Sequence, residues 1–237
     1  MKKPAALVQK FLNSGHLAAD SDNEKLKKST LLLMAFPFAV VGLIWGMLYF
    51  FNGLYLSGYI PFCYGILSLL SIFHFTVVKK FNVFRFSQIF LILLLPLFLQ
   101  ISLGGFIPSS GVVLWSIISP LGALAFYDVR QSLRWFVAYI LIVGVAFLLN
   151  DYAAEKFKWD ISEKFINALF MMNIIGVSVL IYIIQYYFVG KQFELKQIIA
   201  EKNKEITDSL NYAKRIQQSQ MASEKYIEEN LKRLQKK

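Results

Sequence analysis

Six long runs of apolar residues, separated by shorter polar stretches, dominate the sequence. Each run is close to the roughly 20 residues that an α-helix needs to cross the hydrocarbon core of a bilayer. We therefore expect an all-α fold: an integral membrane six-helix bundle with a cytoplasmic, coiled-coil-like helical extension at its C-terminus. The predicted spans are Thr30–Phe51, Tyr55–Val78, Phe86–Leu103, Ile107–Tyr127, Leu133–Leu149 and Phe165–Val189.

The polar segments at the two ends divide the chain into three predicted parts. These are a cytoplasmic N-terminal amphipathic segment (1–28), a six-transmembrane-helix domain (29–189) and a cytoplasmic signalling helix with its tail (190–237). Apolar residues between Ala5 and Leu17 recur at helical spacing, which predicts a short helix on the membrane surface. Ser21 and Glu24 have the spacing of a capping box, so a helix is expected to start there and continue into the first span.

Composition and charge support burial in a bilayer and suggest an orientation. Only 17% of the 237 residues are charged, against about a quarter in soluble domains, and the mean hydropathy is +0.51. All but three of the 25 Lys and Arg residues fall in the two terminal segments and the loops after the second and fourth spans. Because cytoplasmic loops are rich in Lys and Arg, we expect a multi-pass protein of the inner (plasma) membrane with both termini cytoplasmic. The net charge of +10 would then face anionic lipid, so no nucleic acid partner is expected.

Residues that carry chemistry are scarce along the chain. The spans lack charged residues at mid-depth, which counts against an ion-coupled transporter or pump but leaves a passive pore open. Cys63 is the only cysteine, and no metalloprotease, nucleophile-elbow or phosphate-loop motif occurs. We therefore expect no catalytic residues, no metal, no cofactor and no enzymatic activity in this chain.

The external connection between the third and fourth spans allows two interpretations. Its glycines, proline and serines suit a tight hairpin with capped helix ends. An aromatic wall with a few hydroxyls is also typical of a small-ligand site. On the second interpretation, the ligand-binding residues would be Phe106, Ser109, Ser110 and Trp115.

The tail after Gly190 shows a weak coiled-coil pattern. Five of eight positions in a 4-3 alternation are apolar, and Lys202, Ser209 and Gln220 occupy the others. Such a seam favours a homodimer whose helices pair loosely or shift register; a single amphipathic helix on the membrane is the alternative. The predicted signal-transmitting residues are Leu195, Ile199, Ile206, Ala213 and Ile216.

Two segments resemble known families. The run Leu103–Gly111, followed by Leu114-Trp115 and by Ser119–Leu124, resembles the six-helix membrane domain of bacterial class III adenylyl cyclases, over about residues 10–190. That resemblance implies a regulatory or receptor-like module that precedes a dimerising helix and a cyclase domain. Glu201–Gln217 resembles the linker before SpoIIE-type phosphatase domains in Bacteroidetes sensor proteins. The metal-binding aspartates of neither enzyme have counterparts in this sequence, so no catalytic residue is carried over.

Taken together, these features predict a membrane-embedded sensor or regulatory module. A cue would pass through the last span to a cyclase-like or phosphatase-like cytoplasmic output that is not in this chain. The expected partners are the lipid bilayer, a second copy, a cytoplasmic signalling enzyme and a small-molecule or lipid ligand. The alternatives are a small transporter or channel, and a membrane adaptor that recruits a separate enzyme.

Overall fold

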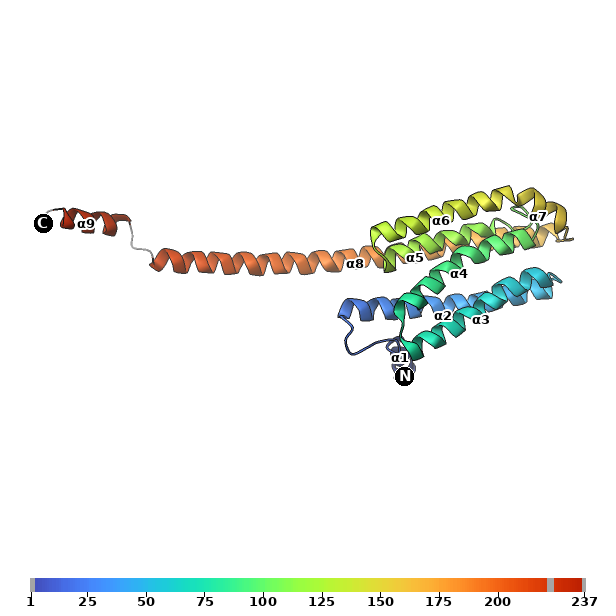
Figure 1. Cartoon of the computed structure of the whole chain (residues 1–237), viewed down its shortest axis with the longest axis horizontal. Coiled ribbons are helices and arrows are strands. Elements are labelled where there is room, and N and C mark those ends of the chain that lie inside the picture. The colour runs from blue at the N-terminus through green and yellow to red at the C-terminus, as the bar shows by residue number, and fades with distance from the viewer. Residues whose placement is uncertain (1–2, 221–223, 236–237) are drawn as a thin grey trace. The chain divides into compact units, whose positions relative to one another are not determined.

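Every secondary-structure element that the computed structural model describes is helical (Figure 1). The structure describes residues 3–220 and 224–235. It comprises two units, Met1–Tyr182 and Ile183–Lys237. The elements are α1 (Lys3–Leu12), α2 (Asp22–Phe51), α3 (Tyr55–Val78), α4 (Phe81–Ser102), the 3₁₀ helix η1 (Val112–Ile117), α5 (Ile118–Phe126), α6 (Val129–Leu148), α7 (Asn150–Lys156), α8 (Glu163–Gln220) and α9 (Glu224–Leu234).

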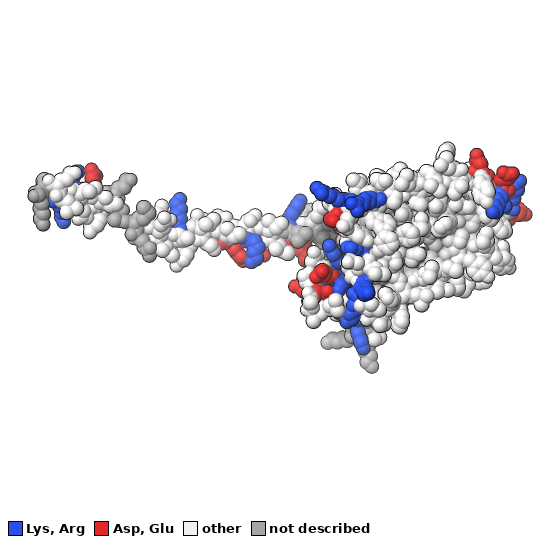
Figure 2. All heavy atoms as spheres, viewed as in Figure 1, with Lys and Arg blue, Asp and Glu red and all other residues white. Residues whose placement is uncertain are grey.

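Five helices are long and apolar enough to cross a membrane: α2, α3, α4, α6 and the Glu163–Tyr186 part of α8. On the face shown in Figure 2, the charged side chains of the first unit gather at its two ends, and the band between them is almost free of charge. This arrangement suits a bilayer, because a charge in the hydrocarbon core is costly. The structure thus confirms a helical protein with the features of a multi-pass membrane protein.

The predicted fourth span, Ile107–Tyr127, is wrong in its first part. Residues 103–111 form consecutive turns, and helical structure begins at Val112 with η1 before it continues as α5. Gly104, Gly105 and Gly111 have φ angles of 96°, 101° and 65°, which a right-handed helix excludes. Because a 3₁₀ helix rises about 2.0 Å per residue, η1 and α5 together still extend about 25 Å.

The helices α2 and α3 approach each other closely through two glycines. A β-carbon added to Gly46 would lie 2.9 Å from the carbonyl oxygen of Gly58 and 2.7 Å from Cβ of Phe62. A β-carbon on Gly58 would in turn lie 3.0 Å from the carbonyl oxygen of Gly46. Small residues are the usual means by which membrane helices bring their backbones together. This contact holds α2 and α3 as a pair, and both contribute to the cavity described below.

The N-terminal segment is attached to one end of this pair. The predicted capping box is confirmed. The Ser21 hydroxyl accepts from the backbone N–H of Glu24, and the Glu24 carboxylate accepts from the backbone N–H of Ser21. Asp20 and Lys28 form an ion pair of 2.6 Å whose side chains are only 8% and 5% exposed. Lys79, at the end of α3, donates to the carbonyl oxygen of His16 (3.1 Å). The turn after α1 therefore connects the start of α2 with the end of α3.

Replacing Gly46 with alanine is expected to destabilise the protein by about 1 to 3 kcal/mol, because the new β-carbon overlaps the backbone of α3. Gly144→Ala is the matched control, since a β-carbon at Gly144 of α6 meets nothing within 4 Å. Thermal unfolding of both variants in the same detergent measures the difference. Equal melting temperatures for the two variants would contradict the close packing of α2 on α3.

The Asp20–Lys28 pair predicts a loss of stability in acid. The hydrogen bond from Lys28, followed by that from the backbone N–H of Leu17, holds the pKa of Asp20 below its ordinary value. The unfolded chain therefore takes up this proton first, so the stabilisation is present above about pH 4 and is lost as the pH falls further. Unfolding measured between pH 6 and pH 3 should show a smaller decline for Asp20→Asn than for the wild type. The same decline in both proteins would exclude the pair as a cause.

Candidate functional site

An apolar cavity of about 60 Å³ lies in the first unit where α2, α3, α4 and η1 meet. Its walls are almost entirely apolar. Apolar cavities stay free of water and accept apolar ligands. Its principal lining residues are Trp45, Pro61, Tyr64, Pro96, Leu99 and Trp115.

Two prolines stand at the wall of this cavity. Pro61 lies within α3 and Pro96 within α4, and both are almost completely buried. A proline inside a helix removes one backbone hydrogen bond and crowds the preceding turn, which bends or loosens the helix. Such positions are tolerated in membrane helices when neighbours supply compensating contacts. The cavity thus lies where α3 and α4 each lack one backbone hydrogen bond.

Trp115 joins this cavity to α8. Its indole Nε1 donates to Oδ1 of Asn173 (3.0 Å), and its ring lies 2.7 Å from the position that a β-carbon on Gly176 would occupy. Asn173 is fully buried, and its Nδ2 donates to the carbonyl oxygen of Ser110 (3.0 Å). On the other side, the Trp115 ring meets the Trp45 ring edge-on at 6.1 Å. The Trp115 side chain therefore forms part of the cavity wall and also makes a specific contact with α8.

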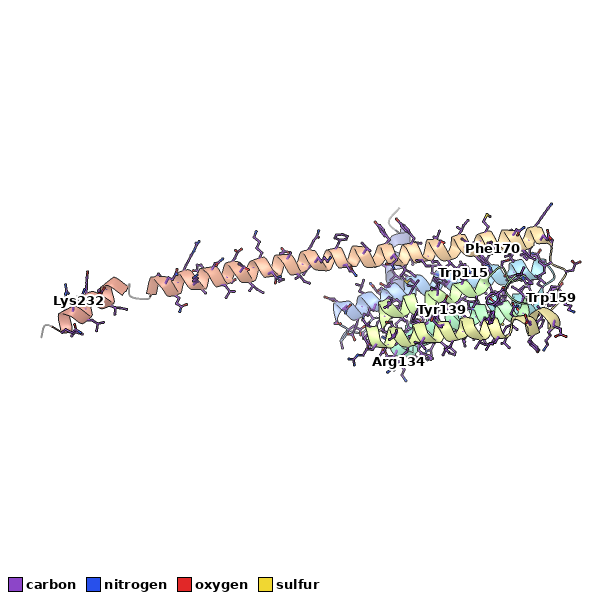
Figure 3. All side chains as sticks on the ribbon, turned by 90° about the horizontal axis from the view of Figure 1, so that it is seen from above. Trp115, Arg134, Tyr139, Trp159, Phe170 and Lys232 are labelled. Carbon is purple, nitrogen blue, oxygen red and sulfur yellow. The ribbon has the colours of Figure 1, made fainter. Side chains whose placement is uncertain are left out.

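The helix α8 presents one narrow face to the rest of the first unit. Its buried residues there include Leu169, Asn173 and Val177, which are spaced four apart and so share a side of the helix. The aromatic side chain of Phe170, on another side, is half exposed (Figure 3). Asn173 is the polar member of the buried row, so its bond to Trp115 is sheltered from competition by water.

The four residues predicted to bind a ligand are near one another but do not line one cavity. Trp115 is the member that lines the apolar cavity. The Ser109 and Ser110 hydroxyls are buried and donate to the carbonyl oxygens of Phe106 (3.3 Å) and Ile166 (2.8 Å). Phe106 packs in a separate apolar cluster with Leu97, Val113 and Ala146. The two serine hydroxyls thus stabilise the hairpin through bonds to backbone carbonyl oxygens. A role of the four residues in ligand binding stays a prediction.

Sequence reasoning missed Asn173 and Gly176. A signal was available, because an amide in an apolar span needs a partner within the protein. The glycine follows three residues later and therefore lies on the same face of the helix. The amide and the glycine together mark the face of the last span that packs against another segment.

In the second unit, the predicted signal-transmitting residues lie on the polar part of α8. Ile199, Ile206 and Ile216 are between 41% and 58% exposed, and Ala213 is exposed as well. Lys202, in the same seam, pairs with Glu205 at 2.7 Å. The side chain of Leu195 lies outside the described residues. The seam thus leaves apolar side chains uncovered by the described part of the chain.

Comparisons with known proteins give no relative for this chain. No family model, no curated protein and no solved structure matches it. The resemblances to cyclase membrane domains and to phosphatase linkers therefore stay predictions from the sequence.

A double-mutant cycle on Trp115→Phe and Asn173→Leu should reveal a coupling free energy of about 1 kcal/mol between the two side chains. This value lies within the range measured for hydrogen bonds between membrane helices. Thermal or denaturant unfolding in detergent gives the required stabilities. Trp159→Phe serves as the matched control, because the Trp159 indole donates to the carbonyl oxygen of Ser102 (2.8 Å). Its effect should add to that of Asn173→Leu. Additivity in the Trp115 cycle as well would mean that the bond contributes nothing to stability.

Proposed function

We propose that this chain is a membrane-embedded sensor or regulatory module that conveys the state of its apolar cavity through α8 to a cytoplasmic signalling enzyme. The observation that carries the proposal is the double role of Trp115, which lines the cavity and bonds to Asn173 of α8. The same helix continues without interruption from Glu163 to Gln220, so its apolar and polar parts share one backbone.

The proposed topology has six passes with both termini in the cytoplasm. The segment Val112–Phe126 would serve as the fourth, shorter pass beside the five long helices. One end of the first unit is rich in Lys and Arg, whereas the other holds mixed charges (Figure 2). Figure 3 places Arg134 and Trp159 at opposite ends of the bundle, which suits a basic cytoplasmic side and an external aromatic belt. In this topology, residues 190–237 are a cytoplasmic extension.

The proposed ligand is a small apolar molecule or the end of a lipid acyl chain, since the cavity holds only about 60 Å³. The cavity walls offer almost no polar surface, so neither an ion nor a sugar would find partners there. The same property favours a sensor over a channel, because conduction needs a continuous polar lining. An occupant would press on Trp115 and so change its contact with α8. A signal requires only that the two arrangements differ by a few kcal/mol.

The proposed output depends on pairing of two copies through the tail. The uncovered isoleucines of α8 recur with coiled-coil spacing, while Lys202 and Ser209 interrupt the seam. A seam of this kind holds two helices together weakly enough for their register to respond to the bundle. The extension would then present different surfaces to its partner enzyme in the two registers.

Cross-linking of the full-length chain tests this proposal. In a Cys63→Ser background, Ile206→Cys should form an intermolecular disulfide under mild oxidation, because position 206 lies in the seam. Adding Trp115→Phe should change the rate of cross-linking by at least about twofold, the lower end of measured couplings between sites. Trp159→Phe is the matched control, since Trp159 bonds to the carbonyl oxygen of Ser102 and does not line the cavity. Absence of a cross-link would refute the homodimer, and an equal response to both tryptophan variants would refute transmission through Trp115.

Filling the seam should remove this sensitivity. Lys202→Leu combined with Ser209→Leu makes two more seam positions apolar, which favours one tight register. We expect faster cross-linking at Ile206→Cys in this variant and no further effect of Trp115→Phe. If Trp115→Phe still altered the cross-linking rate, its effect would have to reach the tail by a route other than a change of coiled-coil register.

A further inference from the structure

A second hollow, distinct from the apolar cavity, lies between α4 and α6 at the basic end of the first unit. It is an open groove of about 690 Å³. Its principal lining residues are Arg85, Phe86 and Phe90 of α4, Tyr127, and Arg134 and Trp135 of α6. None of its lining residues lines the apolar cavity or belongs to the hairpin.

The groove combines two kinds of surface. Asn82, Arg85, Gln131 and Arg134 provide hydrogen-bond donors at one end. The rest of the wall is aromatic or aliphatic and follows α4 from Arg85 to Leu93, about 12 Å along the helix axis. A groove with cationic donors at its end and a long apolar wall matches an amphiphile with an anionic head.

The positive charge in the groove has no ion-pair partner in the part of the chain that the structure describes. No carboxylate there pairs with Arg85 or Arg134. Arg85 donates to the carbonyl oxygen of Phe126 and to Oδ1 of Asn82, and lies 3.8 Å over the ring of Tyr127, while its buried Nε has no partner. Asp128 is nearby in sequence, but its carboxylate caps α6 by accepting from the N–H of Gln131 (2.7 Å).

We propose that this groove binds one anionic phospholipid from the leaflet at the basic end of the bundle. The phosphate lies beside the Arg134 and Arg85 guanidinium groups, and one acyl chain lies along Phe86, Phe90 and Trp135. Basic pockets between membrane helices are known sites for anionic lipid headgroups. A free phosphate would leave the aromatic wall uncovered, so the groove selects the whole lipid. The bound lipid links α4 to α6.

Lipid binding to the purified full chain in detergent tests the proposal, with dioleoyl phosphatidylglycerol and dioleoyl phosphatidylcholine as the probes. Native mass spectrometry should show one retained phosphatidylglycerol and a clear preference for it over phosphatidylcholine. Arg134→Gln should lower that preference about fivefold, the effect of one basic residue near an anionic headgroup. Arg130→Gln removes the same charge one turn earlier, outside the groove, and should leave the preference unchanged.

Two outcomes of the lipid-binding measurements would overturn the proposal. Equal losses in Arg134→Gln and Arg130→Gln would mean diffuse attraction to a basic surface, and displacement of the lipid by glycerol phosphate would mean a site for the headgroup alone.

A second measurement tests the acyl chain independently of the arginines. Phosphatidylglycerol with brominated acyl chains should quench the fluorescence of the wild-type protein, and Trp135→Phe should remove a distinct part of that quenching. Quenching that is unchanged by Trp135→Phe would place the acyl chain elsewhere and refute the proposed position.

Discussion

Exclusion of charge from the middle of the bundle is the constraint on which the rest of the structure depends. Between the charged ends of the first unit, polar groups can find partners only inside the protein, because the bilayer offers none. Serines meet this need for η1 and α5: the hydroxyls of Ser116 and Ser119 donate to the carbonyl oxygens of Leu93 (2.8 Å) and Ile89 (3.0 Å) of α4. These bonds fix the short helical segment against α4, and with it the position of Trp115.

Much of the fold was predictable from the sequence, because segments that cross a bilayer must be long and apolar. The capping box at Ser21 and the start of α2 were also predictable, since both depend on residues within one turn of each other. The segment 103–111 was assigned in part to a helix because its residues are apolar enough. Hydropathy carries no information on the sign of φ, and the positive φ angles of Gly104 and Gly105 decide the structure there.

The candidate site was only partly predictable for a different reason. Trp115 was singled out because it follows a distinctive hairpin, whereas Pro61, Pro96 and Asn173 come from three other helices. Their convergence depends on how these helices pack, and no local pattern encodes it. The serines of the hairpin were predicted to face a ligand, yet their hydroxyls bond to nearby backbone carbonyls. Small polar residues in a membrane protein often serve such internal needs first.

The 3₁₀ geometry of η1 aligns two side chains in the wall of the cavity. With three residues per turn, side chains three positions apart are eclipsed, so Val112 and Trp115 stand in one straight column parallel to the helix axis. Both belong to the cavity wall. In an α-helix the same two side chains would be offset by about 60° around the axis, so they would share one side of the helix without standing in one column. The tight winding of six residues therefore aligns the indole with the hollow in front of it.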